Sequence, residues 1–354
     1  MARDTGTDDP RVKVRPGKGS RPRTKIRPDY SDAERGRIFG VDRGRYRVRM
    51  ESGTQLTAVK ARELGRRGIV VGDLVAVVGD TSGKKDTLAR IAAVDERTTE
   101  LRRTPEESDL AKNERVIVSN ATQLVIVTAL AQPEPRLGMI DRCLVAAYDA
   151  GMTPILVLTK SDLASPAALQ EHYAPLNLEI YVSSIHDDEV DDSDGGTGVT
   201  TGGDVAEIFD DGLDEIREAL RDEVSVLVGH SGVGKSTLIN ELIPTAQRSV
   251  GHVNEVTGRG RHTSTSAMAF DMPGGGTVID TPGVRTFGLR HVSAETLLRG
   301  FPDLMDVTEE CPRGCTHEEG AQECALDEVT EPRLVSRVDS FRRLLESKSE
   351  TTYN

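Results

Sequence analysis

The chain has 354 residues, enough for two or three separately folded modules, because single domains usually hold about 100 to 200 residues. It has no apolar run near the about 20 residues needed to cross a bilayer, and its polar start lacks the apolar stretch of a secretory signal. We therefore expect a cytoplasmic protein that does not bind membranes. Its net charge of −13 would argue against nucleic-acid binding, but this value is an average over the whole chain.

Charge is distributed unevenly along the chain. Residues 1–103 carry 25 Lys and Arg against 15 Asp and Glu, whereas the remainder carries 20 against 43. This asymmetry suits a protein that docks a basic end on phosphate groups while its acidic remainder stays soluble. The alternative is a solvated charged surface without a partner.

The first two segments differ in pattern. Residues 1–34 are polar, with eight Lys and Arg and no acid between positions 11 and 27, which predicts a basic disordered arm. Residues 35–103 contain five β-rich runs separated by Gly and Asp. They are 36–41, 45–51, 55–60, 74–78 and 87–94. Five short strands predict a small barrel of the OB type, which leaves one face for an oligonucleotide, and an SH3-like accessory barrel is the alternative.

Residues 104–290 alternate between strand and helix patterns, which predicts a domain built on a parallel sheet. Two apolar runs, 124–128 and 154–158, flank a helical pattern that begins at Leu137. Further strands are expected at 180–182, 224–228 and 278–280. Between them, 187–204 is rich in Gly, Asp and Thr and predicts a disordered insertion. Cys143 lies within the helical pattern, so we expect a core residue rather than a nucleophile.

A base-binding motif follows the strand at 154–158, at the strand end where ligands bind in doubly wound sheets. Its residues are Thr159, Lys160, Ser161 and Asp162. One carboxylate can accept hydrogen bonds from both N1–H and N2–H₂ of guanine, whereas adenine offers no such pair. We therefore predict that Asp162 selects guanine and that the Lys160 stem lies along the base. Ser183 and Ser184, after the next strand, would cover the O6 side. In isolation, Ser161 and Asp162 are ordinary helix N-cap residues.

A phosphate loop lies between the strand at 224–228 and a helix expected to begin at Thr237. Its residues are Gly229, His230, Ser231, Gly232, Val233, Gly234, Lys235 and Ser236. The glycines let backbone N–H groups surround the β-phosphate, the helix N-terminus adds its dipole, and Lys235 reaches the β and γ oxygens. We expect Ser236 to hold Mg²⁺.

A second phosphate motif, Asp280-Thr281-Pro282-Gly283, follows the strand at 278–280. Asp280 at the strand end can hold the magnesium shell, and Gly283 can meet the γ-phosphate. In isolation the tetrapeptide fits an ordinary turn.

Residues 291–354 contain three of the four cysteines of the chain within one short stretch. The candidate ligands are Cys311, Cys315, His317 and Cys324. Three thiolates and one imidazole saturate a tetrahedral Zn²⁺, so we predict one structural zinc ion in a small helical lobe, with reduced core cysteines as the alternative.

These motifs resemble the GTPase motif set in a rotated order, with the base motifs before the phosphate loop. Together with the barrel and the cysteine cluster, they resemble the ribosome small subunit-dependent GTPase A family, also called RsgA or YjeQ, over roughly residues 35–345. Further segments that resemble this family lie at 139–142, 258–263, 280–285 and 287–289. The fold implied is an OB-type β-barrel, a circularly permuted P-loop GTPase domain and a zinc-binding α-helical domain.

The resemblance also implies a function. It implies a monomeric assembly factor that converts GTP to GDP and phosphate with Mg²⁺, binds the small (30S) ribosomal subunit and its rRNA rather than DNA, and assists late maturation. Hydrolysis would drive its release. The alternatives are a permuted GTPase of the large subunit, an RNA-binding module with a non-hydrolysing nucleotide site, and a phosphate-loop kinase.

Hydrolysis requires a group that positions water, and Val284 occupies the place where many GTPases carry Gln. The resemblance suggests His262 for this role, with Thr263 or Thr265 closing on Mg²⁺. An exposed loop histidine or a ribosome contact is the alternative for His262.

Two departures from the family pattern stand out. The base motif usually begins with Asn, whose side chain braces the phosphate loop, so Thr159 predicts somewhat weaker nucleotide affinity. In the cysteine cluster, the first pair is one residue closer and the last gap one residue longer than the family pattern. Because the chain runs from Asp280 directly into the zinc lobe, we hypothesise that GTP sets the posture of that lobe on the small subunit.

Overall fold

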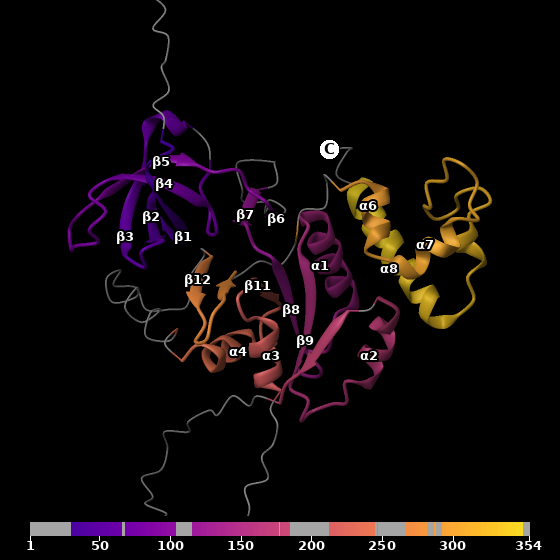
Figure 1. Ribbon diagram of the computed structural model, residues 1–354. Coiled ribbons are helices and arrows are strands. Elements are labelled where there is room, and N and C mark those ends of the chain that lie inside the picture. Colours follow the sequence, from indigo (N-terminus) through magenta and orange to yellow (C-terminus); the bar gives the residue numbers. More distant parts are fainter. Residues whose placement is uncertain are drawn as a thin grey trace, which may run out of the picture. The chain divides into compact units, whose positions relative to one another are not determined.

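The structure is a computed structural model that describes residues 30–65, 68–103, 115–176, 178–184, 212–244, 246, 267–281, 287 and 292–349 (Figure 1). Residues 1–29 of the predicted arm and the whole predicted insertion, 187–204, lie outside these ranges. Within the described ranges, no helix combines the length and apolar composition that crossing a membrane requires.

The predicted five-stranded barrel is confirmed. Its strands are β1 (Glu34–Asp42), β2 (Arg45–Met50), β3 (Gln55–Lys60), β4 (Leu74–Gly79) and β5 (Ala89–Val94), with the short helix η1 (Arg62–Leu64) after β3. They pair in the order β1-β2-β3-β5-β4, and β4 returns to β1, which closes the barrel. Alternate side chains fill the interior, among them Ile38, Val48 and Ile91, each fully buried.

The central domain is built on a mostly parallel sheet with strand order β10-β9-β8-β11-β13-β12. The strands are β8 (Gln123–Ala129), β9 (Thr153–Thr159), β10 (Glu179–Val182), β11 (Val224–Gly229), β12 (Met268–Asp271) and β13 (Thr277–Asp280). Only β12 among these runs antiparallel to its neighbour in the domain. Every residue of β8 is buried, as expected for a parallel strand covered on both faces.

Helices cover both faces of this sheet (Figure 1). Helix α1 (Leu137–Ala150) shares an apolar cluster with Leu124 and Ile126, and α2 (Ala167–Tyr173) with η2 (Ala174–Leu176) joins the same cluster. Helices α3 (Leu213–Ala219) and α4 (Lys235–Leu242) share a second cluster with Val125 and Val127. Because successive side chains of a strand point to opposite faces of the sheet, the two faces have separate apolar cores.

Two sequence expectations in this domain meet different outcomes. The helix expected from Thr237 begins at Lys235, because helical geometry starts directly after Gly234. Cys143 is buried in the core, so the prediction of a core residue is confirmed, and burial raises the pKa of its thiol to about 12.

A two-stranded ribbon between the barrel and the central sheet was not predicted. It pairs β6 (Glu100–Arg103) with β7 (Arg115–Ser119). Gly72 packs against it at φ +94°, and a Cβ there would lie 1.8 Å from the Ser119 carbonyl oxygen, so only glycine fits. Asp73 is buried and accepts hydrogen bonds from Arg97 and from the Ser119 hydroxyl. The ribbon is thereby fastened to the barrel.

The C-terminal lobe consists of residues 292–349. It contains α6 (Ala294–Arg299), α7 (Pro302–Thr308), η3 (Ala325–Glu328) and α8 (Pro332–Ser349). The Ser293 hydroxyl caps α6 by accepting from the Thr296 N–H, and Pro302 begins α7 at a position that suits its missing donor. Phe301 and Phe341 are fully buried and lie in the same apolar cluster as α1.

Candidate functional site

The phosphate loop lies between β11 and α4. Gly232 and Gly234 both have φ +83°, a backbone conformation that glycine adopts without strain. A Cβ on Gly229 would come within 2.6 Å of the Val127 carbonyl oxygen. Gly234 occupies the N-cap position of α4 and has no side chain that could cap it, and the first turn includes Ser236 and Thr237. An anion can therefore bind to the backbone N–H groups of the loop and of the helix start.

Lys235 and Asp280 contact each other although they are 45 positions apart. The Lys235 ammonium group donates to the Asp280 carboxylate, and both side chains are mostly buried. Thr281, the next residue, donates its hydroxyl to the Leu227 carbonyl oxygen at 2.8 Å, which fixes the motif against β11. The predicted γ-phosphate contact and the predicted Mg²⁺ ligand thus lie side by side.

The base motif is braced against the phosphate loop by Thr159. Its hydroxyl donates to the Val233 carbonyl oxygen at 2.6 Å and lies 3.4 Å from the Thr128 carbonyl oxygen. Threonine therefore makes, with a shorter side chain, the kind of contact expected of the usual asparagine. The weaker affinity expected from Thr159 stays a prediction, and this contact argues against a large loss.

The two base loops lie together at the ends of β9 and β10. The Ser161 N–H donates to the Ser183 carbonyl oxygen at 3.2 Å, and Ser183 is buried. Lys160 has φ +57°, and its ammonium group contacts the Gln132 carbonyl oxygen, a partner that sequence reasoning missed. Asp162 is exposed at the start of the following turn, and Ser184 is half-buried. The arrangement leaves the Asp162 carboxylate accessible to a base.

Four predicted site residues cannot be placed in this way. His262, Thr263, Thr265 and Gly283 lie outside the described residues, as does Val284. Their roles stay predictions.

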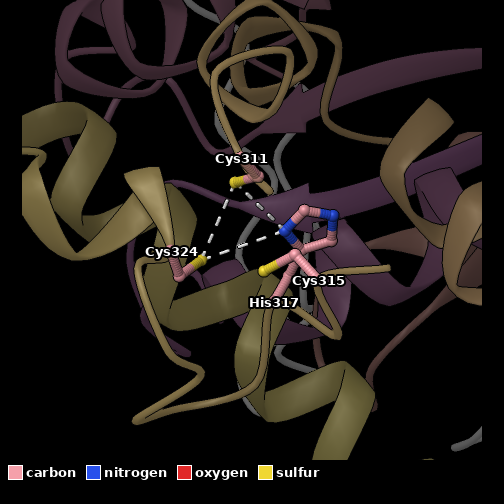
Figure 2. Close-up of side chains that lie close together, drawn as sticks. All are labelled: Cys311, Cys315, His317 and Cys324. Carbon is pink, nitrogen blue, oxygen red and sulfur yellow. Dashed lines mark hydrogen bonds between the residues drawn. The ribbon is translucent and has the colours of Figure 1, made fainter. Parts of the chain in front are cut away.

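The four predicted metal ligands converge in the C-terminal lobe (Figure 2). Their ligand atoms all lie within 4.8 Å of one another. The Cys311 Sγ is 3.6 Å from the His317 Nδ1 and 4.0 Å from the Cys324 Sγ. A tetrahedral zinc ion with bonds of about 2.0 to 2.3 Å spaces its ligands about 3.5 to 3.8 Å apart, so the group fits such an ion.

Two further groups surround these ligands. The Ala325 N–H points at the Cys311 sulfur at 3.3 Å, as N–H groups do around metal-bound thiolates. Arg342 donates to the His317 carbonyl oxygen at 3.2 Å and lies 3.9 Å from the Cys324 sulfur. Arg342 also forms an ion pair with Asp327 at 2.5 Å, so it joins the cysteine cluster to η3. Sequence spacing gave no signal for Arg342.

A buried ion pair, also missed from sequence, attaches the lobe to α1. The Arg337 guanidinium is fully buried and donates to Asp141 at 2.6 Å and to Asp303 at 3.2 Å. It also lies 4.3 Å from the centre of the Phe301 ring. Tyr173 donates to the same Asp141 carboxylate at 3.2 Å. One network therefore joins α1, α2, α7 and α8.

Comparison with known proteins finds a matching family model and similar relatives. The family model described as RsgA GTPase matches residues 94–193 and 200–290. The chain is 37% identical over 294 residues to the small ribosomal subunit biogenesis GTPase RsgA of Pseudomonas fluorescens (strain SBW25), covering 80% of this chain and 76% of the relative. It is also 37% identical over 263 residues to the protein of that name from Pseudomonas aeruginosa (strain LESB58), covering 70% of each.

Two solved structures share the fold. YjeQ from Thermotoga maritima superposes with a TM-score of 0.62 at 24% identity, covering 88% of this chain and 98% of that one. YloQ, described as a circularly permuted GTPase, gives a TM-score of 0.61 at 23% identity, covering 91% and 97%. The predicted architecture is thus matched over most of its length.

Proposed function

The chain belongs to the RsgA GTPase family, and on that premise we propose that it hydrolyses GTP to GDP and phosphate while assisting the late maturation of the small ribosomal subunit. The observation that carries the proposal is the meeting of three loops. The Lys235–Asp280 contact joins both phosphate motifs, and the Thr159–Val233 hydrogen bond joins the base motif to the phosphate loop.

Within this site each group has a defined task. Bound GTP would supply the anion that the phosphate-loop N–H groups and Lys235 neutralise. Mg²⁺ would be held by Ser236 and Asp280, and its charge would compensate the carboxylate once Lys235 turns to phosphate. Asp162 would accept hydrogen bonds from the guanine edge. The Lys235–Asp280 contact holds these two side chains next to each other.

Water positioning is assigned to His262 on the family resemblance, with Thr263 or Thr265 completing the Mg²⁺ shell. Val284 cannot hydrogen-bond through its side chain, so the Asp280 motif itself supplies no such group. A neutral imidazole can orient water or accept a proton.

The partner is proposed to be the small ribosomal subunit with its rRNA, bound by a cytoplasmic monomer. Relatives at 37% identity bear the name small ribosomal subunit biogenesis GTPase, and the positive charge of residues 1–103 suits RNA phosphates. One structural Zn²⁺ held by the Cys311 group would stabilise the C-terminal lobe. Release after hydrolysis follows if the GTP form binds the subunit more tightly than the GDP form.

The proposal is tested with GTP and ATP hydrolysis by the full-length protein, alone and with isolated small or large subunits. We expect GTP-specific turnover that small subunits accelerate. Asp162→Asn should weaken GTP binding about 10- to 100-fold by removing a bidentate contact, whereas Asp306→Asn, an exposed carboxylate on α7, should bind as wild type.

The remaining outcomes identify the alternatives. Stimulation by large subunits alone would assign the chain to the other subunit. Nucleotide binding without turnover under any condition would leave an RNA-binding module with a static site. Equal use of ATP and GTP would reject the guanine site.

A further inference from the structure

A pocket of about 480 Å³ lies where the barrel meets β12 and β13, away from the nucleotide and metal groups. Its barrel wall consists of outward-facing side chains of β1 and β2. The lining residues that matter here are Arg35, Arg37, Phe39, Arg49, Glu51 and Asp271. Arg35 is paired with Asp95 and Arg49 with Asp271, so Arg37 is the guanidinium group that makes the pocket a candidate anion site.

The strand register places two of these arginines directly opposite each other. Arg37 of β1 pairs with Arg49 of β2 in the antiparallel ladder. Like charges in that position destabilise a sheet. Burial lowers the pKa of both guanidinium groups, because each loses contact with water. The repulsion within this pair therefore opposes folding.

The two arginines differ in their partners. Arg49 forms an ion pair with Asp271 and lies 5.2 Å from the centre of the Phe39 ring. Arg37 has no carboxylate within ion-pair distance among the described residues. It lies 3.5 Å from the carbonyl oxygens of Gly72 and Asn120, at the limit of a hydrogen bond. A half-buried cation without a counter-charge is unfavourable, and an anion in the pocket would correct this.

The surrounding face extends the positive charge. Arg45 and Arg47 alternate with buried residues on β2, so they lie on the same outward face as Arg49. Alternate residues of a strand are about 6.8 Å apart, which lets one row of charges follow a chain of phosphates. Guanidinium forks match phosphate oxygens better than ammonium groups do. A polyanion suits this row better than a single small anion.

We propose that the pocket binds a phosphodiester group of single-stranded RNA between Arg37 and Arg49, with the β2 arginines following the adjacent backbone. The inference rests on the proposed RNA partner and adds the residues that hold it. Phosphate in the pocket would share Arg49 with Asp271 and supply Arg37 with its missing counter-charge.

The test measures binding of a labelled single-stranded RNA 12-mer to the full-length protein at several salt concentrations. Arg37→Met keeps the apolar stem and removes the charge. We expect it to weaken binding about tenfold and to lower the slope of log affinity against log salt by about 0.7, one phosphate contact. Arg90→Met, exposed on β5 outside the pocket, removes the same charge and should weaken binding less than twofold.

A second measurement separates ligand binding from a tethering role. Relief of the Arg37–Arg49 repulsion should leave the Tm of Arg37→Met equal to wild type or higher. A Tm lowered by several degrees with unchanged RNA affinity would make Arg37 a structural tether and overturn the proposal. So would equal losses in Arg37→Met and Arg90→Met, which would indicate unspecific charge.

Two controls distinguish the remaining cases. If inorganic phosphate at about 10 mM shifts the Tm in an Arg37-dependent way while RNA binding does not depend on Arg37, the pocket holds a small anion and the proposal fails. If wild type binds neither RNA nor small subunits, the proposed function fails as well. If small subunits stimulate GTP hydrolysis normally but RNA binding does not depend on Arg37, only the proposal for the pocket fails.

Discussion

The central domain meets the C-terminal lobe and the barrel in different ways. Between α1 and the lobe lies one continuous apolar cluster that surrounds the buried Arg337–Asp141 pair. Between the barrel and β12, the ladder contains a single residue pair, Gly40 with Met268, beside the partly exposed Arg49–Asp271 pair and the pocket. The first contact resembles a domain core, and the second leaves room for a ligand.

This difference bears on how nucleotide state could reach each neighbour. A lobe that shares a core with α1 cannot turn independently of the central domain without exposing apolar surface. The barrel reaches the same cluster through Val71, Phe39 and Val41, a smaller set of apolar side chains than the lobe contributes, so its contact can change at lower cost. We therefore expect the lobe to move with α1 and the barrel contact to respond to ligands.

The largest effect tests what holds the lobe together. Cys324→Ser removes one of four predicted ligands, and we expect zinc content to fall from about one equivalent to well below half, with loss of the lobe's protease resistance. Cys143→Ala, a cysteine outside the cluster, should keep its zinc. Metal analysis of both proteins purified in parallel provides the measurement. Unchanged zinc in Cys324→Ser would remove Cys324 from the ligand set.

The next effect tests the buried pair. Arg337→Met leaves Asp141 and Asp303 buried without their cation, and we expect a loss of about 3 to 5 kcal/mol in the free energy of unfolding. Arg299→Met removes an exposed arginine that pairs with Glu295 on α6, and should cost less than about 1 kcal/mol. Urea titration measures both variants. Similar values would mean that the lobe is not fastened through Arg337.

Much of the fold was predictable from local patterns. Alternation in the β-rich runs indicated the barrel, apolar runs indicated the parallel strands, and glycine spacing placed the phosphate loop. These signals lie within short stretches, where period and turn chemistry act directly. The cysteine group could be predicted for the same reason, since all four ligands lie within fourteen residues.

What could not be predicted depends on pairing between distant segments. Asp141 and Arg337 are 196 positions apart, and neither stands out in its own helix. The repulsive Arg37–Arg49 pair exists only in the observed register, because a shift by one residue would turn one of them to the other face. The β6–β7 ribbon was missed because its strands are only four and five residues long, and three of the four residues of β6 are charged. The partner of the Thr159 hydroxyl, the Val233 carbonyl oxygen, is 74 positions away along the chain, so the bracing contact could not be predicted from the sequence.

The smallest effect distinguishes the two contacts most sharply. Asp271→Asn removes the carboxylate partner of Arg49, a pair whose Asp271 side chain is 53% exposed. Exposed pairs contribute little, so we expect the free energy of unfolding to change by less than about 1 kcal/mol, several times less than for Arg337→Met.

The same variant should act on RNA in the opposite direction from Arg37→Met. With Asp271 neutral, Arg49 loses its paired carboxylate, so affinity for the single-stranded RNA 12-mer should rise about two- to threefold, a few tenths of a kcal/mol. Asp306→Asn makes the same charge change outside the pocket. It serves as the control for a general effect of net charge on RNA affinity. Equal gains in both variants would mean that Asp271 does not compete with phosphate. A loss of stability comparable to that of Arg337→Met would mean that the barrel contact is as firmly built as the lobe contact, and the distinction between them would fall.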